Sequence, residues 1–238
     1  TCMGVLHATG EALTLAMSGD AALLAIIGVS LRTTLVSLAM AFPLAVAAGY
    51  WLATTRSPAR AVCIWLVQTA LSLPTVLIGL LLYLLLSRAG PLGNLHWLFT
   101  QPGIVAGQML IGLPLMTALT LHSVQAVDRR IAETAIILGA GRARTAVTVL
   151  FEARFGIVAA VVHGFGRVVS EVGCALMVGG NIAGETRTIT TAIALETSKG
   201  EFAQGIALGL VLITIALVVN AALVLLQGQA RHVPAGAA

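Results

Sequence analysis

Residues 30–53 read SLRTTLVSLAMAFPLAVAAGYWLA, and this stretch decides the fold class. A helix needs about 20 mostly apolar residues to cross a bilayer. Four further stretches have the same character, namely residues 61–86, 103–121, 155–179 and 203–226. The sequence therefore predicts an all-α integral membrane protein with about five transmembrane helices.

The composition indicates a lipid environment. Of the 238 residues, 58% are hydrophobic and 9% are charged, whereas soluble domains are about 25% charged. A soluble core of this size cannot bury so much apolar surface. The 13 basic residues are scattered and have no aromatic neighbours that could stack on bases. The expected surroundings are therefore the lipid bilayer, and no nucleic acid partner is indicated.

Three of the spans contain a proline, at Pro43, Pro74 and Pro114. A proline within a membrane helix is tolerated where neighbouring helices satisfy the freed carbonyl groups. We therefore expect the spans to pack as a bundle, with a kink at Pro43.

The basic residues also predict an orientation, because cytoplasmic loops carry the excess of lysine and arginine. Eight basic residues fall on one side, four fall on the other, and Arg167 lies within a span. We expect the N-terminus outside and the C-terminus inside. The inner set is Arg56, Arg60, Arg129, Arg130, Arg142, Arg144, Arg154 and Arg231, and the outer set is Arg32, Arg88, Arg187 and Lys199.

The chain then divides into three segments. Residues 1–29 are expected to form an extracellular or interfacial segment and not a sixth span, because the mildly apolar residues 2–17 are interrupted by His7, Gly10 and Glu11. Residues 30–226 form the transmembrane domain, and residues 227–238 form a cytoplasmic tail. The longest cytoplasmic connection is residues 122–154.

This connection has the pattern of two short helices. Asp128 can cap a helix over Ile131–Leu138, Gly139 suits the following turn, and a second helix is expected over Arg142–Glu152. The first helix is apolar on one face, at Ile131, Ile136 and Leu138, and such a face suits insertion into the cleft of a partner protein. The alternative is an amphipathic helix that lies on lipid and carries the arginines of the inner side.

The fourth span contains two charged residues, Arg167 and Glu171. Their spacing of four places them on one helix face, and an unpaired charge in hydrocarbon is costly, so we expect them to pair. The pair either fixes helix packing or borders a translocation path. Small residues nearby would allow a second helix or a second copy of the chain to approach, namely Ala160, Gly164, Gly166, Ser170 and Gly173.

Several hydrogen-bond donors follow the fourth span. Asn181, Gly184, Thr186, Arg187 and Thr188 supply amide, hydroxyl and guanidinium groups, which suit a tetrahedral oxyanion. Solvation alone also explains most polar loops of this kind.

Signals of catalysis or cofactor binding are missing from the sequence. Cys2, Cys63 and Cys174 form no CxxC pair, and the two in spans are expected to be small buried hydrophobic residues. The histidines lack the spacing of metal ligands. No phosphate-binding loop occurs, and Lys199 is the one lysine of the sequence. We expect no catalytic residue, no metal and no cofactor in this chain.

The inner connection resembles a family motif. Glu133-Thr134-Ala135-x-x-x-Gly139 is similar to the E-A-A-x-x-x-G motif of ATP-binding-cassette (ABC) importer permeases. The chain departs from the family at Thr134, and Phe151-Glu152 replaces its later leucine-proline pair. The resemblance implies a type I ABC importer permease fold. It also implies that Glu133, Ala135, Gly139 and Arg142 couple the chain to a separate ATPase, which binds ATP and Mg²⁺.

Further runs resemble the oxyanion branch of that family. Ser170-Glu171-Val172-Gly173 and the Asn181–Thr188 run look like molybdate permeases. Val178-Gly-Gly-Asn-Ile and Gly90-Pro91-Leu92-Gly93 look more like tungstate permeases. The implied substrate is a tetrahedral oxyanion moved inward, with tungstate first, molybdate next and sulfate last.

The family also implies partners, namely a second copy of this chain, two cytoplasmic ATPase subunits and an extracytoplasmic oxyanion-binding protein. A path for a dianion should avoid a deep binding well, so neutral donors are favoured over a ring of arginines. The residues expected at the path or its gate are Arg167, Ser170, Glu171, Gly173, Thr190 and Thr191.

Two other classes of protein remain as alternatives. An ion-coupled secondary transporter would use Arg167–Glu171 as its charge relay, although the five spans contain no internal repeat. A membrane-embedded enzyme would have to use Arg167, Glu171 and His163, and His163 is better explained as a helix contact.

Overall fold

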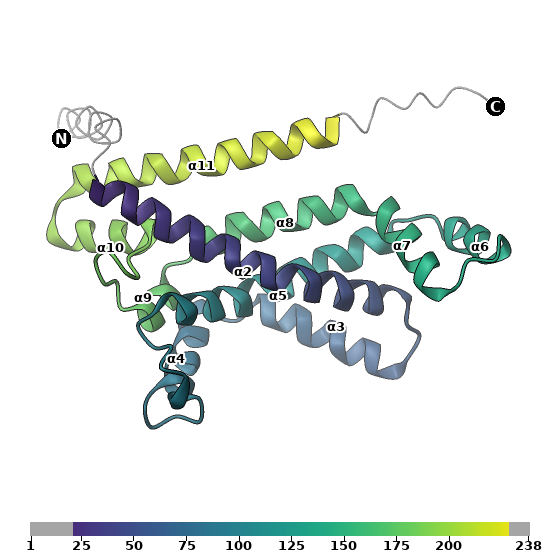
Figure 1. Ribbon diagram of the computed structural model, residues 1–238, viewed down its shortest axis with the longest axis horizontal. Helices are drawn as coiled ribbons and strands as arrows, with labels where there is room; N and C mark the ends of the chain where they lie inside the picture. The colour runs from purple at the N-terminus through teal and green to yellow at the C-terminus, as the bar shows by residue number, and fades with distance from the viewer. Residues whose placement is uncertain (1–20, 229–238) are drawn as a thin grey trace. The chain divides into compact units, whose positions relative to one another are not determined.

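The computed structural model describes residues 21–228, and side chains up to residue 225. Its regular elements are all helical, and no strand occurs among these residues (Figure 1). The predicted all-α fold is confirmed. The elements in chain order are α2 (Ala21–Thr54), α3 (Pro58–Leu71), α4 (Thr75–Leu86), the 3-10 turn η1 (Gly93–Leu95), α5 (Gln101–Gln125), α6 (Arg129–Ile137), α7 (Arg142–Glu152), α8 (Arg154–Val169), α9 (Gly173–Gly179), α10 (Ile189–Lys199) and α11 (Phe202–Gly228).

Three helices of the described chain, α2, α5 and α11, are long and apolar enough to cross a membrane. Two bent pairs, α3 with α4 and α7 with α8, raise this number to five if each pair is one span. The predicted count of about five is consistent with this range. Helix α2 begins at Ala21, earlier than the expected span. Residues 1–20 and 229–238, which include most of the expected outer segment and tail, lie outside the described residues.

The second expected span is not one helix. The helix is interrupted at Pro74, and the direction of the helix axis changes by 101° between α3 and α4. Pro74 has no N–H for the helix ladder, and its ring disfavours helical geometry at the preceding residue. Pro43 and Pro114 instead lie inside unbroken helices. The expectation that the bundle would tolerate all three prolines as mid-helix residues was therefore wrong for Pro74.

The fourth expected span is interrupted as well. Helix α8 ends at Val169 and α9 begins at Gly173, so Arg167 and Glu171 do not share one helix as predicted. The Glu171 carboxylate accepts a hydrogen bond from the backbone N–H of Cys174, at 3.1 Å between Oε1 and N. Such local bonds from side chain to backbone compete with the helix ladder.

The chain forms two compact units, which are described separately. Unit 1 contains described residues 21–39, 73–112 and 165–217, and unit 2 contains residues 40–72, 113–164 and 218–228. Helices α2, α5, α8 and α11 contribute residues to both.

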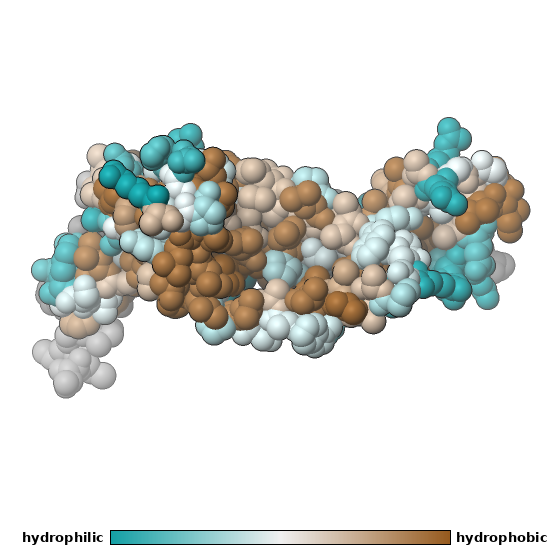
Figure 2. Space-filling model, turned by 90° about the horizontal axis from the view of Figure 1, so that it is seen from below, coloured by the Kyte–Doolittle hydropathy of each residue, from teal (hydrophilic) through white to brown (hydrophobic). Residues whose placement is uncertain are grey.

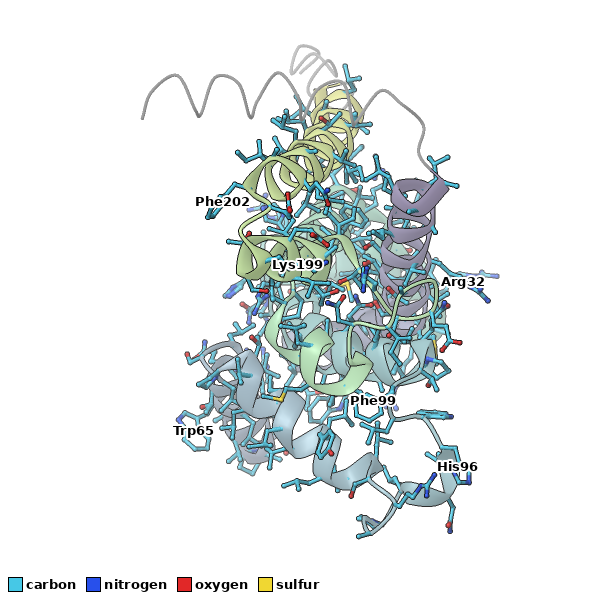
Figure 3. The ribbon with its side chains drawn as sticks, turned by 90° about the vertical axis from the view of Figure 1, so that its left-hand side faces the viewer. Arg32, Trp65, His96, Phe99, Lys199 and Phe202 are labelled. Carbon is cyan, nitrogen blue, oxygen red and sulfur yellow. The ribbon has the colours of Figure 1, made fainter. Side chains whose placement is uncertain are left out.

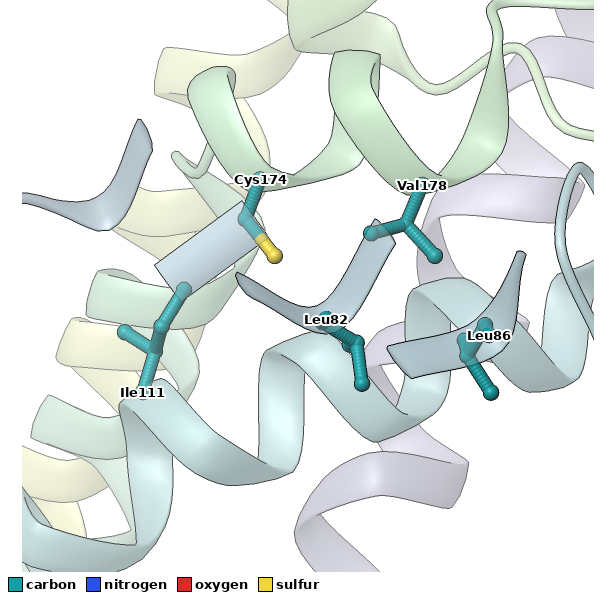
Figure 4. Packing of buried hydrophobic residues seen from close by; sticks show 5 residues of the cluster. All are labelled: Leu82, Leu86, Ile111, Cys174 and Val178. Atoms are coloured by element: carbon teal, nitrogen blue, oxygen red, sulfur yellow. The ribbon is translucent and has the colours of Figure 1, made fainter. Parts of the chain in front are cut away.

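In unit 1, α9 packs closely against α4 and α5. Cys174 and Val178 point from α9 toward Leu82, Leu86 and Ile111 (Figure 4). The glycines Gly79 and Gly107 permit this approach, because a Cβ at Gly79 would lie 2.7 Å from the Cα of Cys174. Cys174 is buried, as predicted. A second cluster holds α10 against α2 and α11 through Ile189, Ala192 and Leu208.

In unit 2, the core joins α2, α5, α7 and α8. Val124, Val149, Ala153 and Ile157 form the buried cluster, with Tyr50 packed against it. A Cβ at Gly49 would lie 2.7 Å from that of Thr120, so α2 and α5 approach closely at this point. The end of α7 and the end of α5 are therefore held in one packed block.

Much of the described surface is apolar. Figure 2 shows a broad hydrophobic surface where α4 lies. Exposed leucines and valines in this number are unfavourable in water and natural in lipid. The exposed residues of α4 are Val76, Leu77, Leu80, Leu81, Leu84 and Leu85.

Candidate functional site

Helices α6 and α7 form a hairpin in unit 2 (Figure 1). Asp128 caps α6, since its Oδ1 accepts the backbone N–H of Arg130 at 2.9 Å. Gly139 has a φ of +84° in the turn, a conformation that glycine adopts without strain. The predicted pair of helices with its cap and turn is confirmed, although α6 begins at Arg129 and ends at Ile137.

The two helices of the hairpin differ in burial. Thr145 and Val149 of α7 are buried, and Val149 belongs to the core of unit 2. None of the 9 residues of α6, all of which the structure describes, is buried. Helix α7 is thus anchored in the core of unit 2. Helix α6, which we call the free helix, contacts that core through the half-buried Ala132 and has no fully buried residue.

The free helix ends in an apolar tip, which we define as residues 136–138. The exposed fractions are 61% for Ile136, 83% for Ile137 and 81% for Leu138. Contiguous exposed apolar side chains of this size mark a binding surface. The sequence pattern had indicated Ile136 and Leu138 but not Ile137, and it had included Ile131, which is half-buried.

Charged side chains surround the tip. Arg129, Arg130, Arg142 and Arg144 are exposed, as is Glu133. Within residues 21–228, no hydrogen bond or ion pair involves the Glu133 carboxylate. Figure 2 shows hydrophilic and hydrophobic side chains next to each other on this hairpin. Such a surface matches a partner that offers an apolar groove with a polar rim.

The motif residues of α6 face two different cavities. Ala135 lines a groove of about 520 Å³ between α6 and α7. Glu133 lines a cavity of about 650 Å³ that also includes the end of α2 and the start of α3. Gly139 and Arg142 are exposed at the turn. The structure brings the four predicted coupling residues onto one hairpin, but onto different faces of it.

In unit 1, the break between α8 and α9 holds the predicted ion pair. Nη1 of Arg167 lies 2.9 Å from Oε2 of Glu171. The Glu171 side chain is 4% exposed, whereas that of Arg167 is 41% exposed. The carboxylate therefore has a partner for each oxygen, Arg167 on one and the Cys174 N–H on the other. The predicted pairing is confirmed.

The predicted threonines support this break from within the protein. Oγ1 of Thr190 donates to the carbonyl oxygen of Glu171 at 2.7 Å. Thr191 is fully buried and forms a capping box with Thr188 at the start of α10. Ser170 is exposed, and its hydroxyl donates to the carbonyl oxygen of Gly166 at 2.8 Å. Arg167 and Ser170 are thus the exposed polar side chains beside the break.

Gly173 is a close-packing position beside the same break. A Cβ there would lie 2.6 Å from a methyl carbon of Val76, so a larger residue would displace the start of α9 from α4.

His163 is exposed on α8, with Nδ1 at 2.8 Å from the carbonyl oxygen of Ala159. Among residues 21–228, no group of three or more possible metal ligands occurs.

The outer donor segment is partly structural. Thr186 is buried and its hydroxyl donates to the carbonyl oxygen of Gly179 at 2.6 Å. Arg187 makes a long bond from Nη2 to the Asn181 carbonyl oxygen, at 3.5 Å, and its buried Nε has no partner within the described chain. Of the predicted oxyanion donors, Arg187 retains an unused N–H, whereas Thr186 and Thr188 serve the fold.

Sequence reasoning missed a polar stripe on α2. Ser30, Thr33, Thr34 and Ser37 are all buried. Their spacing of i, i+3, i+4 and i+7 places them on one helix face, a pattern that was readable from the sequence. Ser30 accepts the backbone N–H of Ile189 at 2.6 Å and so links α2 to α10. By contrast, Arg32 points away from the neighbouring helices (Figure 3).

The described chain is an all-helical protein with several apolar helices and an exposed hairpin between two of them, an architecture that suits a membrane permease. Residues 41–232 match the family described as "Binding-protein-dependent transport system inner membrane component". The chain belongs to this family, whose members are inner-membrane permease subunits of ABC transporters, and the resemblance drawn from Glu133–Gly139 is confirmed. Permease subunits of this kind are generally non-catalytic and carry no cofactor, and ATP hydrolysis belongs to a separate subunit.

Relatives in this family are named for anion uptake. The tungstate uptake system permease protein TupB of Campylobacter jejuni is 45% identical over 65% of this chain and 65% of its own length. A probable anion ABC transporter permease protein of Haloferax volcanii is 38% identical over 81% of this chain and 84% of its own. The molybdenum transport system permease protein ModB of Azotobacter vinelandii is 33% identical over 72% and 78%.

A solved structure supports the fold. The bacterial ABC transporter involved in the import of the acidic polysaccharide alginate matches with a TM-score of 0.72. The match covers 92% of this chain and 82% of that chain, at 18% sequence identity. At this identity the likeness concerns the fold, which is that of an ABC importer permease.

Proposed function

We propose that this chain is the permease subunit of an ABC importer that moves a tetrahedral oxyanion inward, driven by ATP hydrolysis in a separate subunit. The exposed apolar tip on an otherwise anchored hairpin is the observation that supports this proposal best. Tungstate is the proposed first substrate, molybdate the second and sulfate the last. The names of the relatives from Campylobacter jejuni and Azotobacter vinelandii support the first two.

The hairpin is proposed to lie in the cytoplasm, in agreement with the eight basic residues of the inner set. There the tip would insert into a groove on the ATPase. Burial of one large aliphatic side chain contributes about 1.5–3 kcal/mol. Glu133 and Arg142 would contact the polar rim of the groove, and Ala135 would keep α6 close to α7.

Coupling follows from the anchored helix. Val149 of α7 packs on Val124 of α5, so a displacement of the hairpin displaces the end of α5 as well. Close-packed interiors transmit such shifts because they have little free volume. Closure of the ATPase pair would thereby reach the transmembrane helices.

The break between α8 and α9 is proposed to border the path. Arg167 and Ser170 would face it, while Glu171, Thr190 and Thr191 hold its wall in place and Gly173 keeps α9 against α4. The Glu171 carboxylate neutralises much of the Arg167 charge, so a passing dianion would meet a shallow well. A shallow well favours release as well as entry.

The complete transporter would contain two copies of this chain, two ATPase subunits with ATP and Mg²⁺, and an extracytoplasmic oxyanion-binding protein. Family membership supports the binding protein as a partner, since the family is described as binding-protein-dependent. The two copies of the chain and the two ATPase subunits are part of the proposal.

The test is an Ile137→Asp variant in the reconstituted transporter. A charge at the tip should reduce ATP-dependent tungstate uptake at least tenfold and release the ATPase from the purified complex. The control is Val147→Asp, which changes an apolar residue of α7 outside the tip that is 66% exposed, against 83% for Ile137. This variant should retain most uptake. Full uptake by Ile137→Asp would refute the docking role, and uptake without ATP would indicate a secondary transporter.

A further inference from the structure

The cavity beside Glu133 is lined by three arginines that the proposed transport cycle does not use. It lies within unit 2, where the end of α2, the start of α3, the end of α5 and α6 surround about 650 Å³. Its basic side chains come from two places in the sequence. Arg56 and Arg60 lie at the elbow between α2 and α3, and Arg129 is the first residue of α6.

Two of these arginines are free to bind an anion. Within the described chain, the side chains of Arg56 and Arg129 make no hydrogen bond and no ion pair. Arg60 is held by a bond from Nε to the carbonyl oxygen of Leu52, at 2.6 Å, which leaves its terminal nitrogens available. Unpaired guanidinium groups that share one cavity favour an anionic occupant with several oxygen atoms.

Two carboxylates also line the cavity, Asp128 and Glu133. One oxygen of Asp128 is engaged by the backbone N–H of Arg130, so this carboxylate is turned to the start of α6. Three arginines against two carboxylates leave an excess of positive charge. The expected occupant is therefore a phosphate diester with one negative charge, for which this excess is sufficient.

An apolar helix leads away from the same cavity. None of the 14 residues of α3, all described, is buried. Val62, Trp65 and Leu66 are more than half exposed, and Trp65 points away from the protein (Figure 3). Arg60 and Ala61 of this helix line the cavity, so a ligand with its charged end there would have its apolar part along α3.

We propose that this cavity binds the phosphate headgroup of an anionic phospholipid whose acyl chains lie along α3. Basic pockets beside membrane helices are suited to such headgroups. A free phosphate or a free oxyanion would match the arginines but leave α3 and most of the cavity without a contact. The headgroup joins Arg56 and Arg60 to Arg129 and so ties the free helix of the hairpin to the membrane.

Binding of the lipid to the cavity does not depend on transport activity, but the effect of the lipid on coupling rests on the proposed function. If α6 docks the ATPase, a lipid bound to Arg129 sets the position from which α6 engages it. The efficiency of coupling should then depend on the anionic lipid content of the membrane.

The test is native mass spectrometry of the full complex. The complex is reconstituted in bilayers of phosphatidylglycerol or of phosphatidylcholine, the bulk bilayer is then removed, and the lipid that stays bound is measured. The wild type should retain phosphatidylglycerol, and Arg56→Gln and Arg129→Gln should each weaken its binding about fivefold. Arg144→Gln, which removes an exposed arginine of α7 from a different cavity, should leave lipid binding unchanged. Arg56→Lys keeps the positive charge and should retain most of the lipid binding. If it does, the weaker binding of Arg56→Gln reflects the lost charge and not a disturbed fold.

Three outcomes would overturn the proposal. The first is equal retention of both lipids, and the second is displacement of the lipid by millimolar inorganic phosphate or tungstate. The third is loss of the ATPase from the Arg56→Gln and Arg129→Gln complexes while the lipid remains, which would assign these arginines to a protein partner. Lipid retention is measured independently of uptake. If the Ile137→Asp test failed, the lipid-binding result would therefore still support or contradict this proposal.

Discussion

The α6–α7 hairpin and the α8–α9 break both contain charged side chains, but within the described chain the Glu133 carboxylate of the hairpin is exposed and unpaired, whereas the Glu171 carboxylate of the break is buried and paired. At the hairpin, Glu133 is exposed and has no partner within the described chain, and the apolar tip beside it is bare. At the break, both carboxylate oxygens of Glu171 have donors, and Thr190 bonds the adjacent carbonyl group. The break is complete within one chain, whereas the hairpin presents groups that only another molecule can satisfy.

This difference predicts how mutations should act. Changes at the break should lower the stability of the permease itself. Changes at the hairpin should leave the permease folded and affect its assembly or coupling. Each of the following experiments can therefore contradict the comparison as well as support it.

The largest effect is expected for Glu171→Ala. This variant leaves the buried Cys174 N–H without its acceptor, and an unsatisfied buried donor costs about 1–3 kcal/mol. The Arg167 side chain also loses its partner, but it is 41% exposed, so water replaces part of that interaction. Thermal unfolding of the detergent-purified protein should show a clear loss of stability. Glu196→Gln is the control, because Glu196 pairs with the exposed Lys199 and should matter little. Equal stability of Glu171→Ala and the wild type would contradict a self-contained break.

The next effect is expected for Glu133→Lys, which should abolish ATP-dependent uptake. The residue is exposed, so the permease should remain in the membrane with an unchanged melting temperature. Uptake and thermal unfolding measured on the same preparation check both statements. Full uptake would remove Glu133 from coupling, and a large loss of stability would show that its role is structural.

A smaller effect is expected for Gly139→Ala. Gly139 has a positive φ, and a residue with a Cβ costs about 1–2 kcal/mol in this backbone conformation. No atom of the described chain lies within 4 Å of the added carbon, so the whole cost comes from the backbone and none from a clash. The turn should shift, and the ratio of tungstate moved to ATP hydrolysed should fall severalfold.

Gly141→Ala is the matched control for that experiment. Gly141 also has open space around it, but its φ is −69°. An alanine there should leave the coupling ratio unchanged. Similar losses in both variants would mean that the hairpin responds to bulk and not to the conformation of its turn.

Local chemistry made the hairpin predictable from sequence. The cap at Asp128 and the turn at Gly139 act within a few residues of the helix ends that they define. The boundaries were off by two residues at the start of α6, which was expected at Ile131 and begins at Arg129. The apolar spans were predictable for the same reason, because their hydropathy is a property of single segments.

The break at Ser170–Val172 was not predictable in this way. It depends on Thr190, which bonds the Glu171 carbonyl oxygen, and on Ser30, which fixes the start of α10 from 159 residues away. A pattern search along one segment instead reads Arg167 and Glu171 as neighbours four residues apart on one continuous helix. The break at Pro74 had a local signal, but Pro43 and Pro114 carry the same signal inside continuous helices. Tertiary contacts decide between these outcomes.

The bare tip at Ile136–Leu138 also has a consequence for the cell. A permease made in excess over its ATPase would present these three apolar side chains to the cytoplasm. Chaperones and membrane proteases recognise exposed apolar segments of this kind, so orphan subunits would be removed. The same three residues that we propose to dock the ATPase would thus report whether the subunits of the transporter are made in equal numbers.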